Sequence, residues 1–442
     1  MALYKKCTQM SELTRHMGLF QLTMYGVGLI LGAGIYVLIG EAAGFAGNSV
    51  WISFVLGAIA AMFAGLSYAE LTALFPKAAA EYTFVKHAFK NNFIAFIIGW
   101  LTAITSMITS ATVSLGFGGY FSEFVNLPIT MSAVLLIGIL SFVNFIGIKH
   151  SSWMNMVFAI ITICGLALII FIGMTYETSQ HVNYFESPNG LTGIIFAFVL
   201  IFFAFIGFED MANIAEEVKK PKKTLPRAII LSVIISGVIY ILVSLAVVRV
   251  VNWEELAESS APIALVAERA LGSEAHVLLS SIALFAITNT VLITLVAGSR
   301  IFYGMAKEKA FPAILEKIHF KTKTPWIAII VIMMTSIVFT LVGDIVLVAN
   351  ITVFAIVITF AAVNLAVIVL RYTEPEIERR FKVPINIGKF PILPLFGVGI
   401  STYMAFQFEI EVVLVGITII IIGSVLYIIS KKHNESKIRD IR

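Results

Sequence analysis

Two adjacent carboxylates, Glu209 and Asp210, lie inside an apolar stretch that runs from 191 to 213. Ionisable side chains are costly inside long apolar segments and are usually functional where they occur. A carboxyl group in such surroundings holds its proton more tightly than in water, which suits proton exchange near neutral pH. We therefore treat the pair as candidate proton carriers. The alternative is that both acids face a water-filled vestibule, where they repel anions or cap a helix.

The segment 26–35 is a second unusual stretch, because its sequence GVGLILGAGI holds four glycines. Each glycine inside a helix costs about 1 kcal/mol relative to alanine. The four-residue spacing of Gly28 and Gly32 also permits close packing of helices. A lone glycine, Gly207, comes just before the two acids of the other stretch. The occurrence of such glycines in both apolar stretches favours the interpretation that both segments are interrupted helices.

An interrupted helix frees backbone groups deep in an apolar region. The amides that begin a second half-helix carry partial positive charge and can bind a carboxylate. The carbonyl groups that end a first half-helix can accept hydrogen bonds from an ammonium group. Gly32, Ala33 and Gly34 are small enough for a ligand to approach the backbone. The two breaks together predict a site for a zwitterionic α-amino acid.

The elements that must position these residues are membrane-spanning helices. Of the 442 residues, 59% are hydrophobic and 13% are charged, whereas a soluble protein averages about 25% charged residues. Apolar blocks of about 20 residues, the length that crosses a hydrocarbon core, recur along the chain. Backbone groups must pair internally in lipid, so the blocks are predicted to be helices. Twelve are expected, over 18–40, 49–75, 93–121, 129–147, 154–174, 191–213, 228–250, 275–299, 325–342, 346–370, 386–407 and 410–430.

Lys and Arg residues are distributed unevenly between the connecting segments. With twelve crossings, 28 of the 30 fall on the side that holds both tails, and cytoplasmic segments are enriched in these residues. We therefore predict a multi-pass protein of the cell (plasma) membrane with tails 1–17 and 431–442 in the cytoplasm. The interrupted helices are the first and the sixth, which predicts two inverted repeats over 18–174 and 191–370, followed by a helix pair over 386–430.

The connecting segments carry weaker signals. Apolar spacing in 252–272 predicts a short surface helix, and 81–92 could be an interfacial helix or a helical linker. The lysines within 219–223 could contact anionic lipid or simply orient the protein. The segment 431–442 is predicted to be a flexible tail.

Other kinds of site are not expected. Cys7 and Cys164 cannot easily meet, so no disulfide is predicted, and Cys164 is interpreted as a small buried residue. The seven histidines lack metal-ligand spacing. No nucleophile–base arrangement indicates an enzyme, and the polar residues concentrate at two breaks rather than along channel-like stripes. We expect no cofactor, no metal and no nucleic-acid partner.

Four motifs resemble those of the amino acid–polyamine–organocation superfamily, especially its prokaryotic and cationic-amino-acid-transporter-like branches. They are GVGLILGAGI (26–35), AGLSYAEL (64–71), FFAFIGFED (202–210) and SRIFYGMA (299–306). The similarity covers nearly the whole chain. It implies an all-α integral membrane fold with a LeuT-like 5+5 inverted repeat, and a permease that moves amino acids by alternating access.

The resemblance also implies site residues. Backbone amides of Gly32, Ala33, Gly34 and Ile35 would hold the substrate carboxylate. Backbone carbonyls of Phe203, Ala204 and Ile206 would hold its amino group, with Phe203 or Phe205 as an aromatic gate. The side-chain pocket is expected to contain Thr105, Ser106, Thr109, Phe208 and Asn289, and the alternative for Asn289 is a hydrogen bond across helices.

The driving force stays open because two positions depart from some relatives. Thr162 stands where they carry a helix 5 lysine that is thought to couple protons, and Thr105 stands where others carry a helix 3 glutamate. The remaining mechanisms are proton symport through Glu209 or Asp210, exchange or facilitated diffusion, and sodium symport. Substrates could be amino acids, with a slight preference for neutral ones because of the hydroxyl lining, or polyamines and other organocations.

Sodium symport would need a cluster of hard oxygen ligands. Carbonyls near Gly26 and Val27, with the hydroxyls of Thr288 or Thr290, are the candidates. The simpler interpretation of those threonines is a hydrogen bond to their own helix.

Two further charged residues lie near helix ends. Glu70 is interpreted as a structural ion-pair partner for a basic loop residue. Arg300 either forms an inner-gate salt bridge or anchors the basic side of the protein.

Overall fold

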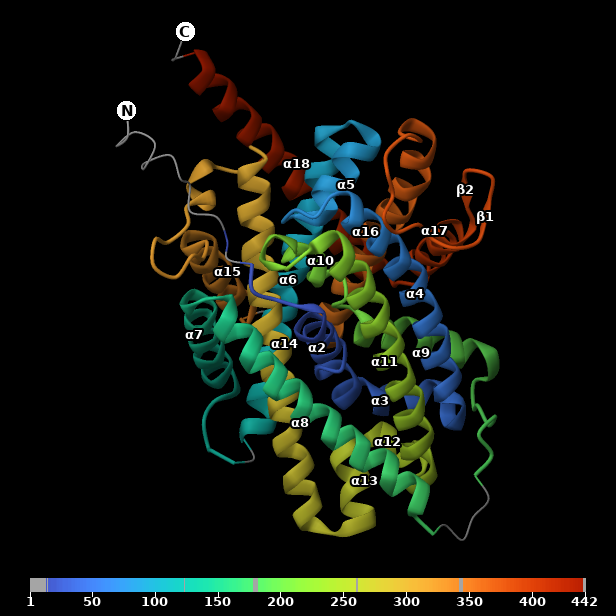
Figure 1. Cartoon of the computed structure of the whole chain (residues 1–442). Helices are drawn as coiled ribbons and strands as arrows, with labels where there is room; N and C mark the ends of the chain where they lie inside the picture. The colour runs from blue at the N-terminus through green and yellow to red at the C-terminus, as the bar shows by residue number, and fades with distance from the viewer. Residues whose placement is uncertain are drawn as a thin grey trace.

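The computed structural model describes residues 13, 15–122, 124–177, 182–259, 261–341 and 345–439, and these fold almost entirely into helices (Figure 1). The helices are α2 (Leu19–Ile30), α3 (Ala33–Ala46), α4 (Val50–Leu74), α5 (Ala80–Phe89), α6 (Asn92–Ser122), α7 (Ile129–Ile146), α8 (Ile148–Thr175), α9 (Gly190–Phe205), α10 (Asp210–Asn213), α11 (Pro221–Val250), α12 (Trp253–Glu258), α13 (Pro262–Leu271), α14 (Ser273–Lys307), α15 (Trp326–Phe339), α16 (Ile345–Thr373), α17 (Ile392–Ala405) and α18 (Ile410–Arg439). Short 3₁₀ turns occur at η1 (Gly47–Ser49), η2 (Ala215–Glu217) and η3 (Ala313–Glu316).

Long apolar helices dominate the described residues. Nine helical segments there are long and apolar enough to cross a membrane, and the first of them, Leu19–Leu74, contains two of the predicted blocks. Trp326–Phe339 and Ile392–Ala405 are shorter apolar helices. The predicted all-α integral membrane class is confirmed. Twelve crossings and the LeuT-like repeat remain predictions.

Both predicted interruptions are present. Helix α2 ends at Ile30 and α3 begins at Ala33, while α9 ends at Phe205 and α10 begins at Asp210. Gly207 has φ +132°, a backbone conformation that side chains with a Cβ rarely adopt. A Cβ atom at Gly207 would lie 2.5 Å from Cγ of Leu29, so the two breaks pack directly against each other.

The broken helices lie in the middle of the molecule. Figure 1 shows α2 and α3 surrounded by α8, α11 and α14, and it places the C-terminal end of α18 at one end of the molecule and α12 and α13 at the other. Helix α3 packs against α9, α11 runs along α4, and α14 packs against both α6 and α8. The breaks are therefore enclosed by long helices from distant parts of the sequence.

The structure decides between the two interpretations of one connecting segment and corrects the prediction for another. The segment predicted as an interfacial helix or a helical linker forms α5, whose Glu81, Phe84 and Val85 are buried, in agreement with the helical linker. The segment 252–272 forms two short helices, α12 and α13, instead of one, because Pro262 starts a new helix.

Several predicted boundaries were wrong. Residues 386–391 form an antiparallel hairpin, β1 (Asn386–Ile387) and β2 (Phe390–Pro391), before α17 begins. Helix α18 continues to Arg439, so most of the predicted flexible tail is helical. Helix α8 begins at Ile148 rather than at 154, because a helix continues through polar residues beyond its apolar block. Cys164 is exposed rather than buried.

Candidate functional site

A small closed cavity lies where the two helix breaks meet. Its volume is about 30 Å³, room for only about one or two water molecules. Five segments of the chain line it, with Leu29, Ile30, Ala33 and Gly34 from the first break, Phe203, Ala204, Ile206, Gly207, Glu209 and Asp210 from the second, Thr102, Thr105, Ser106 and Thr109 from α6, Thr290 and Thr294 from α14, and Ile356 from α16. A larger solute fits only if these segments move apart.

The two carboxylates of the second break face this cavity. Asp210 is only 6% exposed, and Glu209 is buried with its Oε2 accepting a hydrogen bond of 2.8 Å from the amide of Gly207. Within the described part of the chain, no donor binds the carboxylate of Asp210, and no Lys, Arg or His lines the cavity. The acids therefore line a small pocket that holds no basic partner among its described residues.

Of the four predicted carboxylate-binding amides, two belong to residues that line the cavity. These are Ala33 and Gly34, at the start of α3, where the first N–H groups have no partner within the helix. The amide of Ala33 already donates to Oγ1 of Thr290 at 3.3 Å. Gly32 packs against Thr290, and Ile35 points into the core, so neither lines the cavity.

The carbonyl groups that end α9 are partly engaged. The carbonyl of Phe203 accepts a 3.2 Å hydrogen bond from the amide of Ile206. The carbonyl of Ala204 accepts a 3.1 Å hydrogen bond from the hydroxyl of Tyr240, which also bonds to the carbonyl of Ile30. One hydroxyl thus joins both breaks. No pattern in the sequence indicated this role, since Tyr240 lies within an ordinary apolar helix.

Of the two rings predicted as an aromatic gate, only that of Phe203 belongs to a residue that lines the cavity. Phe203 lines the closed cavity and also a second cavity of about 40 Å³, so it lies between the two. The second cavity is formed by Ala33, Gly34, Val37, Leu38, Thr112, Val113, Gly116, Phe203, Ile287 and Ala349. Phe205 packs edge-on against Tyr240 and does not line either cavity.

Phe208 is also absent from the cavity, although it was expected in the side-chain pocket. Its ring packs against Tyr68 and Phe360 in the core. The positive φ of Gly207 turns the chain and directs the next side chain away from the cavity. Thr105, Ser106 and Thr109 do line it.

Asn289 supports the first break instead of lining the cavity. Its Nδ2 donates to the carbonyl of Gly28 at 2.9 Å, and its Oδ1 accepts from Nδ2 of Asn155 at 3.0 Å. Thr162 donates to the carbonyl of Phe158 in its own helix. The α8 residue that faces the first break is therefore Asn155, two turns before Thr162. Its polar side chain in an apolar helix was the available signal.

The predicted sodium ligands are not brought together. Gly26 packs against Met211 and Ser232, and Thr288 donates to the carbonyl of Leu284 in its own helix. Thr290 bonds to the first break, and Val27 is buried in the core. The simpler interpretation of Thr288, a bond to its own helix, is therefore correct.

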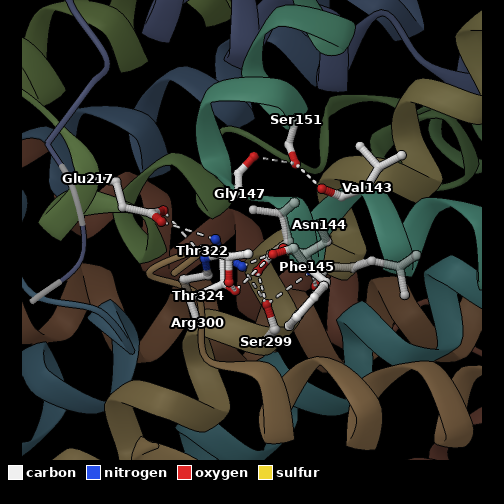
Figure 2. Close-up of polar contacts among 12 residues, drawn as sticks. Val143, Asn144, Phe145, Gly147, Ser151, Glu217, Ser299, Arg300, Thr322 and Thr324 are labelled. Carbon is white, nitrogen blue, oxygen red and sulfur yellow. Dashed lines mark hydrogen bonds and ion pairs between the residues drawn. The ribbon is translucent and has the colours of Figure 1, made fainter. Parts of the chain in front are cut away.

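A buried ion pair joins the C-terminal part of α14 to η2. Figure 2 shows Arg300 between Glu217 and Asn144. Its guanidinium is fully buried and donates to Oε1 of Glu217 at 3.0 Å and to Oδ1 of Asn144 at 2.6 Å. Burial raises the pKa of Glu217, and Arg300 acts in the opposite direction.

The chain segment that leads into α2 is tied to the same ion pair. Met17 forms a parallel bridge with Val218, and the amides of His16 and Met17 donate to the carbonyl of Glu217. The segment that precedes α2, the segment that follows α10, and α14 are thus joined at one point.

Two other acids have structural partners. Glu70 binds Arg371, at the end of α16, as well as the predicted kind of loop partner, Arg379. Glu81 accepts hydrogen bonds from the hydroxyl of Tyr68 at 3.1 Å and from Nδ2 of Asn213 at 3.3 Å. Burial raises the pKa of Glu81 to about 7.

Comparison with known proteins agrees with this geometry. The family model of amino acid permeases matches residues 17–432. The branched-chain amino acid permease BcaP of Bacillus subtilis is 30% identical, over 96% of this chain and 95% of that protein. The methylthioribose transporter of Bacillus subtilis is 29% identical over the same shares. The human cystine/glutamate transporter is 31% identical, over 85% of this chain and 78% of that protein. The chain belongs to the amino acid permease family of the amino acid–polyamine–organocation superfamily.

Proposed function

We propose that this protein is a secondary transporter that binds an α-amino acid in the cavity between the two breaks and moves it together with a proton. The observation that carries the proposal is the pair of buried carboxylates, Glu209 and Asp210, facing a cavity whose described lining holds no basic side chain. Two negative charges in a closed site require compensation. The ammonium group of a substrate and a proton supply it.

The cavity chemistry favours an amino acid over a neutral sugar derivative. This distinction matters because one similar protein is named as a methylthioribose transporter. Gly34 lies in the first turn of α3 and lines the cavity, and the amides of a helix start suit a carboxylate. The acids on the opposite wall suit an ammonium group. The threonine and serine hydroxyls of α6 leave room for small side chains.

Alternating access is proposed from the closures on either side of the cavity. Phe203 separates it from the outer apolar cavity, and the Arg300–Glu217 pair closes the other side. Entry requires Phe203 to turn aside, and release requires the ion pair to part. Both motions involve the broken helices, whose freed backbone makes them the natural hinges.

The membrane orientation is part of the same proposal. The uneven distribution of Lys and Arg favours cytoplasmic termini. The Arg300–Glu217 pair would then be the inner closure and Phe203 the outer one. The repeats over 18–174 and 191–370 remain the proposed origin of the paired breaks.

Uptake of radiolabelled amino acids into proteoliposomes tests this function. With one proton per substrate, an inward gradient of one pH unit supports at most about tenfold accumulation. We expect Glu209→Gln or Asp210→Asn to abolish the stimulation by the gradient. Glu258→Gln, at the exposed end of α12, is the matched control and should respond like the wild type.

Two results would contradict separate parts of the proposal. Equal stimulation in the wild type and in both cavity variants would remove proton coupling and leave exchange or facilitated diffusion. Failure of every amino acid to enter, or to compete with a labelled one, would remove the substrate class.

A further inference from the structure

A third cavity, remote from the transport site, lies at the surface between α2, α7 and α8. Its volume is about 480 Å³, far larger than that of either internal cavity. Its lining joins the chain before α2 to the turn between α7 and α8 and consists of His16, Gln21, Val143, Ile146, Lys149, His150, Ser152, Trp153, Met154 and Met156. The feature combines basic and apolar walls.

Part of the cavity lining is basic. Lys149 and His150 are exposed on the first turn of α8, and His16 faces them from the chain before α2. Partial burial and the charges of Lys219 and Lys149 lower the pKa of His16, which shows that the local potential is positive. Among the described lining residues none is acidic, and no described carboxylate pairs with Lys149. An anionic group would be stabilised here.

The rest of the lining is mainly apolar, with Val143, Ile146, Met154 and Met156. From Ile146, α7 exposes a single stripe formed by Leu135, Ile139, Phe142 and Ile146, whose spacing of four, three and four residues places them on one helix face. Such a stripe is long enough to follow an acyl chain.

Three exposed aromatic residues lie on the elements that form the cavity. Trp153 lines it and is 62% exposed, Phe142 of α7 is 63% exposed, and Phe20, next to Gln21 in the sequence, is 66% exposed. Aromatic side chains gather at the level of lipid headgroups in membrane proteins.

We propose that this cavity binds one phospholipid with an anionic headgroup, whose phosphate lies beside Lys149, His150 and His16 and whose acyl chain follows the exposed stripe of α7. A zwitterionic phospholipid carries a cation of its own that the basic part of the lining disfavours. Because His16 and Gln21 precede and begin the first broken helix while α7 and α8 form the opposite wall, the lipid bridges a proposed moving element and its neighbours.

Native mass spectrometry of the purified protein, with phosphatidylglycerol and phosphatidylcholine of identical chains, tests the site. We expect the wild type to retain one phosphatidylglycerol in preference to phosphatidylcholine. Lys149→Gln with His150→Gln should weaken that retention, by about fivefold for the loss of the Lys149 charge. The control variant Lys382→Gln with Lys389→Gln removes two exposed lysines of the segment after α16 and should retain the lipid like the wild type.

The wild type alone already provides a decisive result, independent of how the variants fold. Equal retention of the two lipids by the wild type would overturn the proposal. Equal losses in the cavity variant and the control variant would overturn it too, since retention would then reflect overall charge. Competition by free glycerol phosphate as strong as that by the whole lipid would show an anion site without an acyl chain and would also contradict it.

Discussion

The hydroxyl of Tyr240 lies 3.1 Å from the carbonyl oxygen of Ala204, the residue before the last of α9. The same hydroxyl bonds to the carbonyl of Ile30, the last residue of α2. A helix end leaves such carbonyls without a partner in the helix, and here one fully buried side chain serves both breaks. Tyr240 therefore couples the two interrupted helices that form the cavity.

Tyr240→Phe should weaken substrate binding and lower stability. The substitution keeps the ring but leaves two buried carbonyls without their donor, which costs about 1–3 kcal/mol. We expect a raised substrate concentration for half-maximal uptake and a lower melting temperature. Tyr403→Phe, on an exposed face of α17, is the control. Indistinguishable behaviour of the two variants would show that Tyr240 does not hold the breaks together.

The pH dependence of stability should report on Glu81. Its folded-state pKa is about 7, raised by burial above the ordinary 4.5. Between these values the unfolded chain releases the proton first, so stability falls as pH rises from about 4.5 to 7 and then levels off. Glu81→Gln removes this fall, which amounts to about 3 kcal/mol.

Melting temperatures of the purified protein between pH 5 and 8 provide the measurement. The Glu81→Gln curve should be flatter than that of the wild type. Glu411→Gln, at an exposed position of α18, should leave the curve unchanged. A wild-type curve that rises over this interval, or an unchanged slope in the Glu81 variant, would refute the assignment.

The ion pair of Arg300 and Glu217 should behave as a buried pair. Arg300→Met leaves a buried carboxylate without its partner and should cost about 3–5 kcal/mol. Adding Glu217→Gln should recover much of the loss, because no unpaired charge remains. Thermal unfolding of the two single variants and the double variant measures the coupling.

An exposed ion pair offers the comparison. Arg269 and Glu255 form a salt bridge with side chains that are 44% and 41% exposed. Arg269→Met should therefore cost at most about 1 kcal/mol. Equal losses at the two pairs would mean that the burial of Arg300 does not determine its contribution.

Gly207→Ala should disrupt the second break. The residue has φ +132°, and an added Cβ would lie 2.5 Å from Cγ of Leu29. Gly190→Ala is the matched control, because Gly190 also has a positive φ, of +55°, with nothing within 4 Å of the added atom. Backbone strain alone costs about 1–3 kcal/mol. We expect the Gly207 variant to lose more stability than the control and to lose uptake, and similar losses in both would argue against packing of the breaks.

The class of protein and the location of its two breaks could be predicted from the sequence. Apolar blocks of membrane length predict helices because lipid offers the backbone no other partners. Glycines and acids inside such blocks are costly, so 26–35 and 202–210 were identifiable without a structure. Thr105, Ser106 and Thr109 could be anticipated as well, as polar residues in the apolar block 93–121.

Which side chains meet at the breaks depends on tertiary packing. Tyr240, Asn155 and Glu217 act on segments far away in sequence, and even the polar Asn155 in its apolar helix does not indicate which segment it contacts. The positive φ of Gly207 turned Phe208 into the core, a direction that depends on how the chain leaves the break. Local sequence sets where a helix is weak. The partners that stabilise the freed groups are set by packing between distant helices, which no local pattern records.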